Sequence, residues 1–257
     1  MDAGFVHLHL HTEFSLLDGA TRIKELVKRV ADYNMPAVAI SDHGVLYGAI
    51  DFYNACQAAG IKPIIGCEVY LAPRTINDRT KQDQASYHLL LLAKDETGYR
   101  NLLRLSTIAN LEGFYYKPRV DKNILRQYAE GLIATSSCLA GEIPDALLKG
   151  DFDRACRLTE EYLDIFGREN FYIELQDHGL PEQHQVNAGL LELAAKYRLP
   201  LLATNDAHYL TREDAAIHDV LLCVQTGATV DDPKRLKFGT EEFYVKSPEE
   251  MAALFRA

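Results

Sequence analysis

Short apolar runs alternate with amphipathic helical patterns, and this alternation restricts the possible folds more than any other feature of the sequence. The apolar runs are residues 5–10, 36–41, 62–71, 88–93, 131–137, 170–176 and 200–205. Most of them are nearly continuous, as in strands that are covered on both faces. The pattern predicts an α/β fold with a mostly parallel sheet, closed or nearly closed into a barrel. In such barrels the active site lies at the C-terminal ends of the strands.

The helical patterns between these runs have apolar residues three and four positions apart. They cover residues 23–30, 152–166 and 186–197, which predicts three amphipathic helices. A further helix is predicted to begin at Ser247-Pro248-Glu249-Glu250, because a capping box is combined there with proline at the first helical position. Residues 72–86 are polar and lack periodicity, so we expect an exposed loop. We find no linker or repeat and interpret residues 1–257 as a single domain.

Charge and cysteine usage limit the protein class. The 257 residues include 27 basic and 37 acidic side chains, a net charge of −10, which argues against a free-standing nucleic-acid-binding protein. The five cysteines form no C-x-x-C pair, so a reducing, cytoplasmic location is favoured over secretion. We expect no signal peptide in the first residues, and no apolar run reaches the roughly 18 residues of a membrane helix.

Residue types that bind metals gather near the ends of the predicted strands. The first run brings His7, His9 and His11 at a spacing of two, so a regular strand would direct all three to one face. The other candidates that follow or end a run are Asp18, Asp42, His43, Cys67, Glu68, Cys138, Asp206 and His208. His88 opens the fourth run, which is the wrong end for a parallel barrel.

This set of side chains indicates a particular metal chemistry. Imidazole and carboxylate groups with one thiolate suit Zn²⁺, Mn²⁺ or Fe²⁺ better than Ca²⁺ or Mg²⁺. They are too many for one tetrahedral ion, so we infer two or three ions with bridging carboxylates, as in phosphoester hydrolysis. The sequence contains no G-x-S-x-G motif and no separate Cys-His pair, which disfavours covalent catalysis.

Six segments also resemble a known family. They are HLHLHTEFSLLDG, ISDHG, IKPIIGCE, HLLLLAKDETGYRNL, GLIATSSC and LLATNDAHYL. They resemble the motifs of the polymerase and histidinol phosphatase (PHP) domain, and residues 231–235 and 243–255 narrow the resemblance to the N-terminal PHP domain of bacterial DNA polymerase III alpha subunits. The resemblance covers nearly the whole chain and implies a distorted, TIM-barrel-like barrel of seven strands.

The family pattern also implies a trinuclear metal centre with nine ligands. Carried over motif by motif, these are His9, His11, Asp18, His43, Glu68, His88, Cys138, Asp206 and His208. The pattern starts at the second histidine, so His7 is expected outside the centre. Asp42 is expected to orient His43 or a neighbouring ligand, and Cys67 to be buried on the opposite side from Glu68. His178, His184 and His218 are expected on helix or loop surfaces.

The resemblance implies a hydrolase in DNA replication: a metal-dependent phosphoesterase that removes nucleotides from a DNA 3′ end with a metal-activated water. Two alternatives stay open. One is a small-molecule phosphatase of the histidinol phosphatase type; the other is a structural module that stabilises the polymerase and docks a proofreading subunit. No catalytic group beyond the metal centre, and no proton donor, can be named.

The length implies the wider context. A chain of 257 residues has no room for the domains of a DNA-directed DNA polymerase. We therefore expect a domain excised from the N-terminus of a much longer subunit. Its partners would be the remainder of that subunit, other replisome subunits and a DNA 3′ end.

The charge is uneven along the chain. Residues 72–126 hold ten basic and six acidic side chains, a segment charge of +4, which leaves −14 for the remainder. This stretch fits a solvated face as well as a DNA-binding surface. Together with metal ions it would give the isolated chain weak, salt-sensitive DNA binding.

Overall fold

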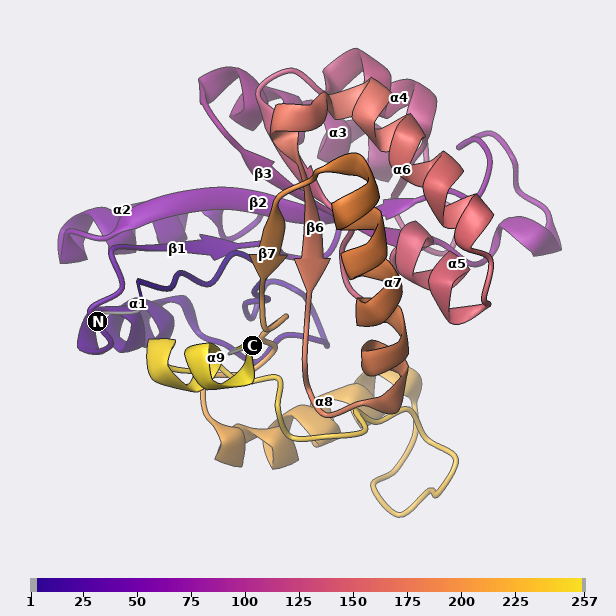
Figure 1. Cartoon of the computed structure of the whole chain (residues 1–257). Helices are drawn as coiled ribbons and strands as arrows, with labels where there is room; N and C mark the ends of the chain where they lie inside the picture. Colours follow the sequence, from indigo (N-terminus) through magenta and orange to yellow (C-terminus); the bar gives the residue numbers. More distant parts are fainter. Residues whose placement is uncertain (1–3, 256–257) are drawn as a thin grey trace.

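Among residues 4–255, which the computed structural model describes, seven strands form one strongly curled sheet (Figure 1). The strands are β1 (Ala37–Ile40), β2 (Lys62–Leu71), β3 (Tyr87–Ala93), β4 (Arg119–Val120), β5 (Leu132–Thr135), β6 (Phe171–Leu175) and β7 (Leu201–Ala203). They follow the order β1-β2-β3-β5-β6-β7, and β4 pairs with β2. The predicted α/β class with seven strands is confirmed.

One predicted strand is absent, and a strand that was not predicted brings the number to seven. Residues 5–10 are extended but form no regular strand, whereas β4, which the sequence did not predict, completes the seven. The extended segment lies between the two ends of the sheet. On one side Ala39 N donates to His7 O at 2.8 Å, and on the other His11 N donates to Ala207 O at 2.8 Å. These irregular bonds connect β1 to the end of β7 and give the distorted barrel.

The direction of β3 departs from the expected parallel arrangement. β3 pairs antiparallel with both β2 and β5, whereas β1–β2, β5–β6 and β6–β7 are parallel. The start of β3 therefore lies at the edge where its neighbours end. This reversal places His88, next to Tyr70 in the β2–β3 register, at the same edge as the other candidate ligands.

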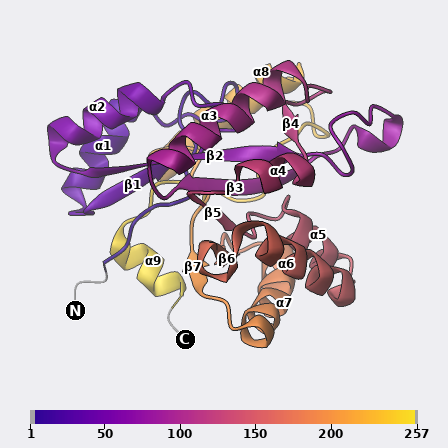
Figure 2. The same cartoon turned by 90° about the horizontal axis from the view of Figure 1, so that it is seen from above.

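Nine helices lie in the part of the chain that the structure describes, and most of them pack around the curled sheet. They are α1 (Ile23–Asp32), α2 (Ala49–Ala59), α3 (Glu96–Leu111), α4 (Lys122–Tyr128), α5 (Glu142–Leu148), α6 (Phe152–Phe166), α7 (Pro181–Tyr197), α8 (Ala215–Thr226) and α9 (Pro248–Leu254). The predicted helices correspond to α1, α6, α7 and α9, and Ser247 and Glu250 form the expected capping box. Figure 2 shows α1 and α2 side by side, with α5, α6 and α7 gathered elsewhere around the sheet. The predicted loop 72–86 is irregular apart from the short 3₁₀ helix η1 (Lys81–Asp83).

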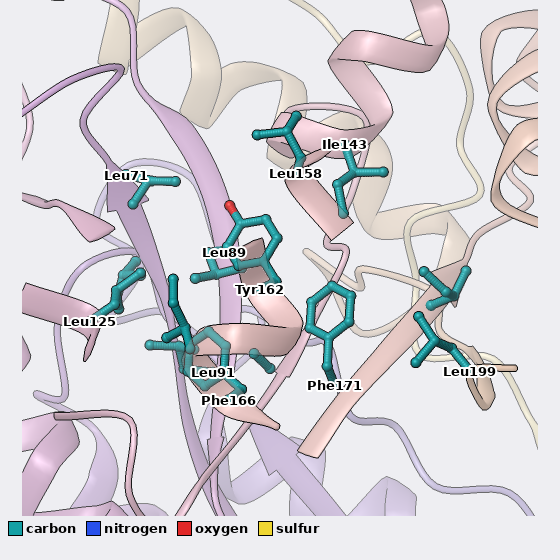
Figure 3. Packing of buried hydrophobic residues seen from close by; sticks show 14 of the residues in the cluster. Leu71, Leu89, Leu91, Leu125, Ile143, Leu158, Tyr162, Phe166, Phe171 and Leu199 are labelled. Atoms are coloured by element: carbon teal, nitrogen blue, oxygen red, sulfur yellow. The ribbon is translucent and has the colours of Figure 1, made fainter. Parts of the chain in front are cut away.

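The largest core cluster lies between the sheet and helices α3 to α7 (Figure 3). Leu89 and Leu91 of β3 belong to it, and the rings of Tyr162 and Phe171 stack in it at 5.4 Å. Leu90 and Leu92 belong instead to a separate small cluster with Ala39. Both faces of β3 are thus buried, which explains its continuous apolar run. None of the helices described is long and apolar enough to cross a membrane.

Candidate metal centre

Glu68 is the central side chain at the edge where β1, β5 and β7 end. It is 1% exposed. Its Oε1 lies 3.3 Å from His9 Nε2 and 3.2 Å from His88 Nδ1. Its Oε2 lies 2.9 Å from His43 Nδ1 and 3.4 Å from His11 Nε2. One buried carboxylate from β2 therefore contacts four histidines that come from three separate parts of the chain.

Asp206 approaches the same histidines from the end of β7. Its Oδ1 lies 3.2 Å from His9 Nε2 and 3.1 Å from His11 Nε2. Its backbone has a φ of 41°, a conformation that costs energy for any residue but glycine and that is often found at functional sites. His208 Nδ1 lies 2.8 Å from the carbonyl oxygen of Asp206. The Nδ1 therefore carries the proton, which leaves Nε2 of His208 free for a metal.

Asp18 and Cys138 complete the cluster at its rim. Asp18 Oδ2 lies 3.0 Å from His43 Nε2, and Oδ1 lies 4.0 Å from His208 Nε2. Cys138 Sγ lies 3.5 Å from Glu68 Oε1 and 3.7 Å from His88 Nδ1. The structure thus brings all nine residues named from the sequence into one continuous cluster.

Three overlapping groups in this cluster have the geometry to hold an ion. They are His11–His43–His208, His9–His11–Asp206 and His43–Glu68–His88. Among residues 4–255, His9 Nε2, His43 Nδ1 and Glu68 Oε2 are buried and make no hydrogen bond of good geometry, although His43 Nδ1 and Glu68 Oε2 are 2.9 Å apart. Since buried polar atoms are almost always satisfied, these three atoms fit divalent ions as their partners. Several ions, rather than one, fit the groups.

The electrostatics of the cluster favour ionised carboxylates. Burial alone would raise the pKa of Glu68, but His88, His9 and His43 outweigh it and hold that pKa well below its usual range. Burial alone would also raise the pKa of Asp206, but His9 and His208 outweigh this effect and lower that pKa. The carboxylates are therefore charged at neutral pH, as metal ligands must be.

The histidines respond in opposite directions. Burial alone would lower the pKa of His43, but Glu68 and Asp18 outweigh it and raise that pKa to about 10. At His208 burial dominates, together with repulsion from His11, and the pKa falls to about 3. In the metal-free protein, His43 is therefore protonated at pH 7 and His208 is neutral.

Asp42 lies behind the cluster and contacts it through Ser15. Its Oδ1 accepts hydrogen bonds from Thr12 N at 2.7 Å and from Ser15 Oγ at 2.8 Å. Ser15 Oγ lies 3.1 Å from His11 Nδ1 and accepts a hydrogen bond of 3.1 Å from His43 N. Asp42 thus fixes the loop that presents both histidines. Cys67 is buried, and its Sγ donates to Asp42 O at 3.3 Å.

Glu174 of β6 is a buried carboxylate at the site that the sequence motifs did not indicate. It accepts hydrogen bonds from His9 Nδ1 at 2.7 Å, Thr204 Oγ1 at 2.5 Å and Gln176 Nε2 at 2.9 Å, and also from Thr135 Oγ1. The bond to Nδ1 sets the tautomer of His9 so that Nε2 faces Glu68 and Asp206. A glutamate within the short apolar stretch 171–175 was the available signal.

Glu174→Gln is expected to lower metal affinity about 10- to 100-fold, because an orienting carboxylate raises the basicity of the histidine it holds. Metal titration by calorimetry measures the change. Glu192→Gln, an exposed site on α7, is the matched control. Equal affinity in Glu174→Gln and the unmodified protein would contradict this role for Glu174.

Four histidines are not among the nine candidate ligands: His7, His178, His184 and His218. His7 is buried and its Nε2 lies 2.9 Å from Lys246 O, apart from the cluster, and His184 is exposed. The expectation of a surface position is wrong for His178 and His218, which are 1% and 2% exposed. His178 stacks on Phe243 at 3.8 Å. Nothing in the local pattern distinguishes such histidines from surface ones, because only the tertiary fold brings the residues that cover them into contact.

A pocket of about 360 Å³ opens in front of the cluster. Asp18, His43, Glu68, Asp206 and His208 line its floor, so solvent and ligands reach the candidate ligands from one side. A substrate would enter at this edge of the barrel, as is general for strand-end sites.

Comparison with known families decides the classification. A family model described as the PHP domain matches residues 7–178. The chain belongs to the PHP domain family. A PHP fold with a histidine-rich cluster that fits several metal ions is the arrangement of a metal-dependent hydrolase.

The most similar curated relatives include two alpha subunits of DNA polymerase III. The one from Treponema pallidum (strain Nichols) is 51% identical over 253 residues, covering 98% of this chain and 22% of the relative. The one from Thermus aquaticus is 52% identical over 255 residues, covering 97% and 21%. This PHP chain therefore spans about a fifth of the relatives it matches, and the resemblance to their PHP domain is confirmed.

Solved structures agree on the fold. An amidohydrolase from Chromobacterium violaceum aligns with a TM-score of 0.50 and 15% identity, covering 79% of this chain and 87% of the other. At this identity the likeness concerns the fold alone.

Proposed function

We propose that this PHP chain is a metal-dependent phosphoesterase that removes nucleotides from a DNA 3′ end, as a 3′–5′ exonuclease. The supporting observation is the convergence of nine ligand-type side chains, with Glu68 central among them and three buried polar atoms left for metal. The proposed ligands are those nine residues, and the proposed ions are two or three of Zn²⁺, Mn²⁺ or Fe²⁺, which such a donor set suits.

Bound divalent ions supply Lewis acidity, which acidifies water and stabilises charge on phosphate oxygens. The chain provides the frame for this chemistry. Glu68 and Asp206 each contact more than one histidine, so they are the candidate bridging carboxylates. Burial, and then Glu68 and Asp206, raise the pKa of the Cys138 thiol well above its usual range in the metal-free protein. As a metal ligand the sulfur would be taken up by an ion, so no free cysteine nucleophile is left at the centre. Water is therefore the proposed nucleophile.

The biological setting is also a proposal. Because the chain matches about a fifth of the polymerase subunits, we place it as the N-terminal PHP domain of such a subunit, unable to extend DNA alone. Its partners would be the remaining subunit and other replisome subunits. A purely structural role in stabilising the polymerase or docking a proofreading subunit is the alternative, and the small-molecule phosphatase is another; the following experiment distinguishes them.

Metal stoichiometry of the purified protein, followed by digestion of single-stranded DNA, tests the proposal. We expect two or three ions per chain, shortening of 5′-labelled DNA from its 3′ end, and loss of activity in chelator. A small phosphomonoester, supplied in parallel, should be hydrolysed more slowly. Faster turnover of the monoester would favour the phosphatase, whereas bound metal without any hydrolysis would favour the structural role.

A further inference from the structure

A groove leads from the metal centre across the surface of the barrel edge. A second pocket, of about 190 Å³, shares Asp18, His43, Tyr70, Lys117 and Gln225 with the pocket in front of the cluster. The two pockets therefore adjoin each other along these residues. A ligand whose phosphate lies at the metal centre can extend into the second pocket.

The far end of this groove is aromatic. Phe14 and Tyr47 line it, and both come from loops that also present candidate ligands, 11–18 and 43–48. Gly48 allows the ring of Phe14 to lie close, because a Cβ there would be 2.7 Å from Phe14 Cδ2. Tyr47 is 62% exposed. An exposed ring that faces a pocket beside a metal site is available to stack on a ligand.

Lys117 lies between the aromatic end and the metal centre. In the part of the chain that the structure describes, it is the only lysine or arginine that lines either pocket. Its Nζ lies 5.1 Å from the centroid of the Tyr70 ring. Its neighbour Pro118 packs on Gly44, where a Cβ would be 2.8 Å from Pro118 Cγ. The backbone beside the lysine is thus packed, and its exposed side chain lies over the Tyr70 ring at the groove.

Most other cations of the basic segment 72–126 are engaged elsewhere. Arg74 pairs with Asp83 at 2.6 Å and Arg126 with Glu161 at 3.2 Å. Arg119 is buried and donates to backbone carbonyls, among them Ile76 O at 3.2 Å. Most of the positive charge in segment 72–126 is therefore engaged in ion pairs and hydrogen bonds within the fold. Lys117 is the cation placed to contact a phosphate at this site.

We propose that this groove is a nucleotide subsite in which a base of single-stranded nucleic acid stacks on Tyr47 while Lys117 contacts the adjoining backbone phosphate. The proposal rests on the proposed phosphodiester chemistry of the metal centre and names its substrate class. Aromatic rings for stacking, together with cations along the backbone, are the means by which proteins bind single strands without reading their sequence. A small phosphomonoester would use the metal centre but would leave the groove empty.

Tryptophan fluorescence tests the subsite without relying on hydrolysis. The chain contains no tryptophan, so Tyr47→Trp introduces a single indole reporter that retains a stacking ring. Titration with single-stranded DNA carrying slowly hydrolysed phosphorothioate linkages at its 3′ end should quench this fluorescence. The same oligonucleotide with abasic sites at its last two positions should quench it much less. Equal quenching by both, or quenching by neither, would overturn the proposal.

Kinetics of the metal-loaded protein give the second readout. Tyr47→Ala and Lys117→Gln should each raise KM for the oligonucleotide about tenfold and change kcat little, and Tyr47→Ala should abolish the preference for a base-bearing end over an abasic one. Tyr53→Ala on α2 and Lys24→Gln on α1, both exposed, are the matched controls. Fluorescence quenching without DNA cleavage would support the subsite and reject the exonuclease; cleavage with a KM that neither substitution changes would reject the subsite alone.

Discussion

Replacing Glu68 with glutamine is expected to lower phosphoester hydrolysis at least about a thousandfold, a loss of roughly 4 kcal/mol of transition-state stabilisation. Its two oxygens contact His9, His11, His43 and His88 within 3.4 Å, so it touches at least one histidine of each of the three candidate ion groups. Glutamine keeps the shape but removes the charge and one of the two oxygens. The variant should therefore bind fewer ions, and metal ions contribute several kcal/mol to such reactions.

The measurement is turnover of 3′-end DNA hydrolysis together with metal content per chain. Glu249→Gln, an exposed carboxylate at the start of α9, is the control and should leave both unchanged. Circular dichroism of each variant checks that it is folded, so that unfolding can be excluded as the cause of lost activity. Full activity in Glu68→Gln with unchanged metal content would mean that the reactive centre is not built around this carboxylate.

The candidate cluster was predictable from the sequence because strand ends in a barrel meet at one edge. His43, Cys138 and Asp206 each follow a short apolar run, and these runs are indeed β1, β5 and β7. His88 did not fit this rule, because local periodicity shows that a strand exists but not in which direction it runs. Only the antiparallel pairing of β3 with β2 and β5 explains its position. The family resemblance named His88 where the spacing alone could not.

The groups that support the cluster were less predictable. Glu174 binds His9 through a network with Thr135 and Thr204, which only the pairing of β6 with its neighbours creates. His218 is buried on α8 with its Nε2 3.9 Å from Asp18 Oδ1, yet α8 lies far from Asp18 in sequence. Residues 5–10 have the composition of a strand, but their hydrogen bonds to both ends of the sheet are too irregular to form one. Each of these depends on tertiary contacts that no local pattern contains.

Metal ions are expected to stabilise the protein against unfolding, and by more at pH 8.5 than at pH 6.0. An ion at a thousand times its Kd contributes about 4 kcal/mol, which for a chain of this size is roughly 10 °C in Tm. The pH dependence follows from His43, whose pKa is raised to about 10, against burial, by Glu68 and Asp18. Coordination requires neutral imidazole, so the ion must displace this proton, and its affinity should increase about tenfold per pH unit below that pKa.

The metal-free protein should change in the opposite direction. A raised pKa in the folded state stabilises the fold fully below the unfolded value near 6.5, and this contribution is lost as pH rises through about 10. The lowered pKa values of Glu68 and Asp206 stabilise the fold above about pH 4.5 and lose that effect on acidification. For the metal-free protein, the contribution of these groups to stability should therefore be largest between about pH 5 and 6.5, while the metal-loaded protein gains stability above that range.

Thermal unfolding at fixed free Mn²⁺, with and without chelator, measures the difference in Tm at each pH. One displaced proton over 2.5 pH units amounts to about 3 kcal/mol, so the difference should widen by several degrees. His184→Gln, an exposed histidine outside the cluster, should leave this widening intact, and a difference in Tm that is flat with pH would show that metal binding displaces no proton from His43.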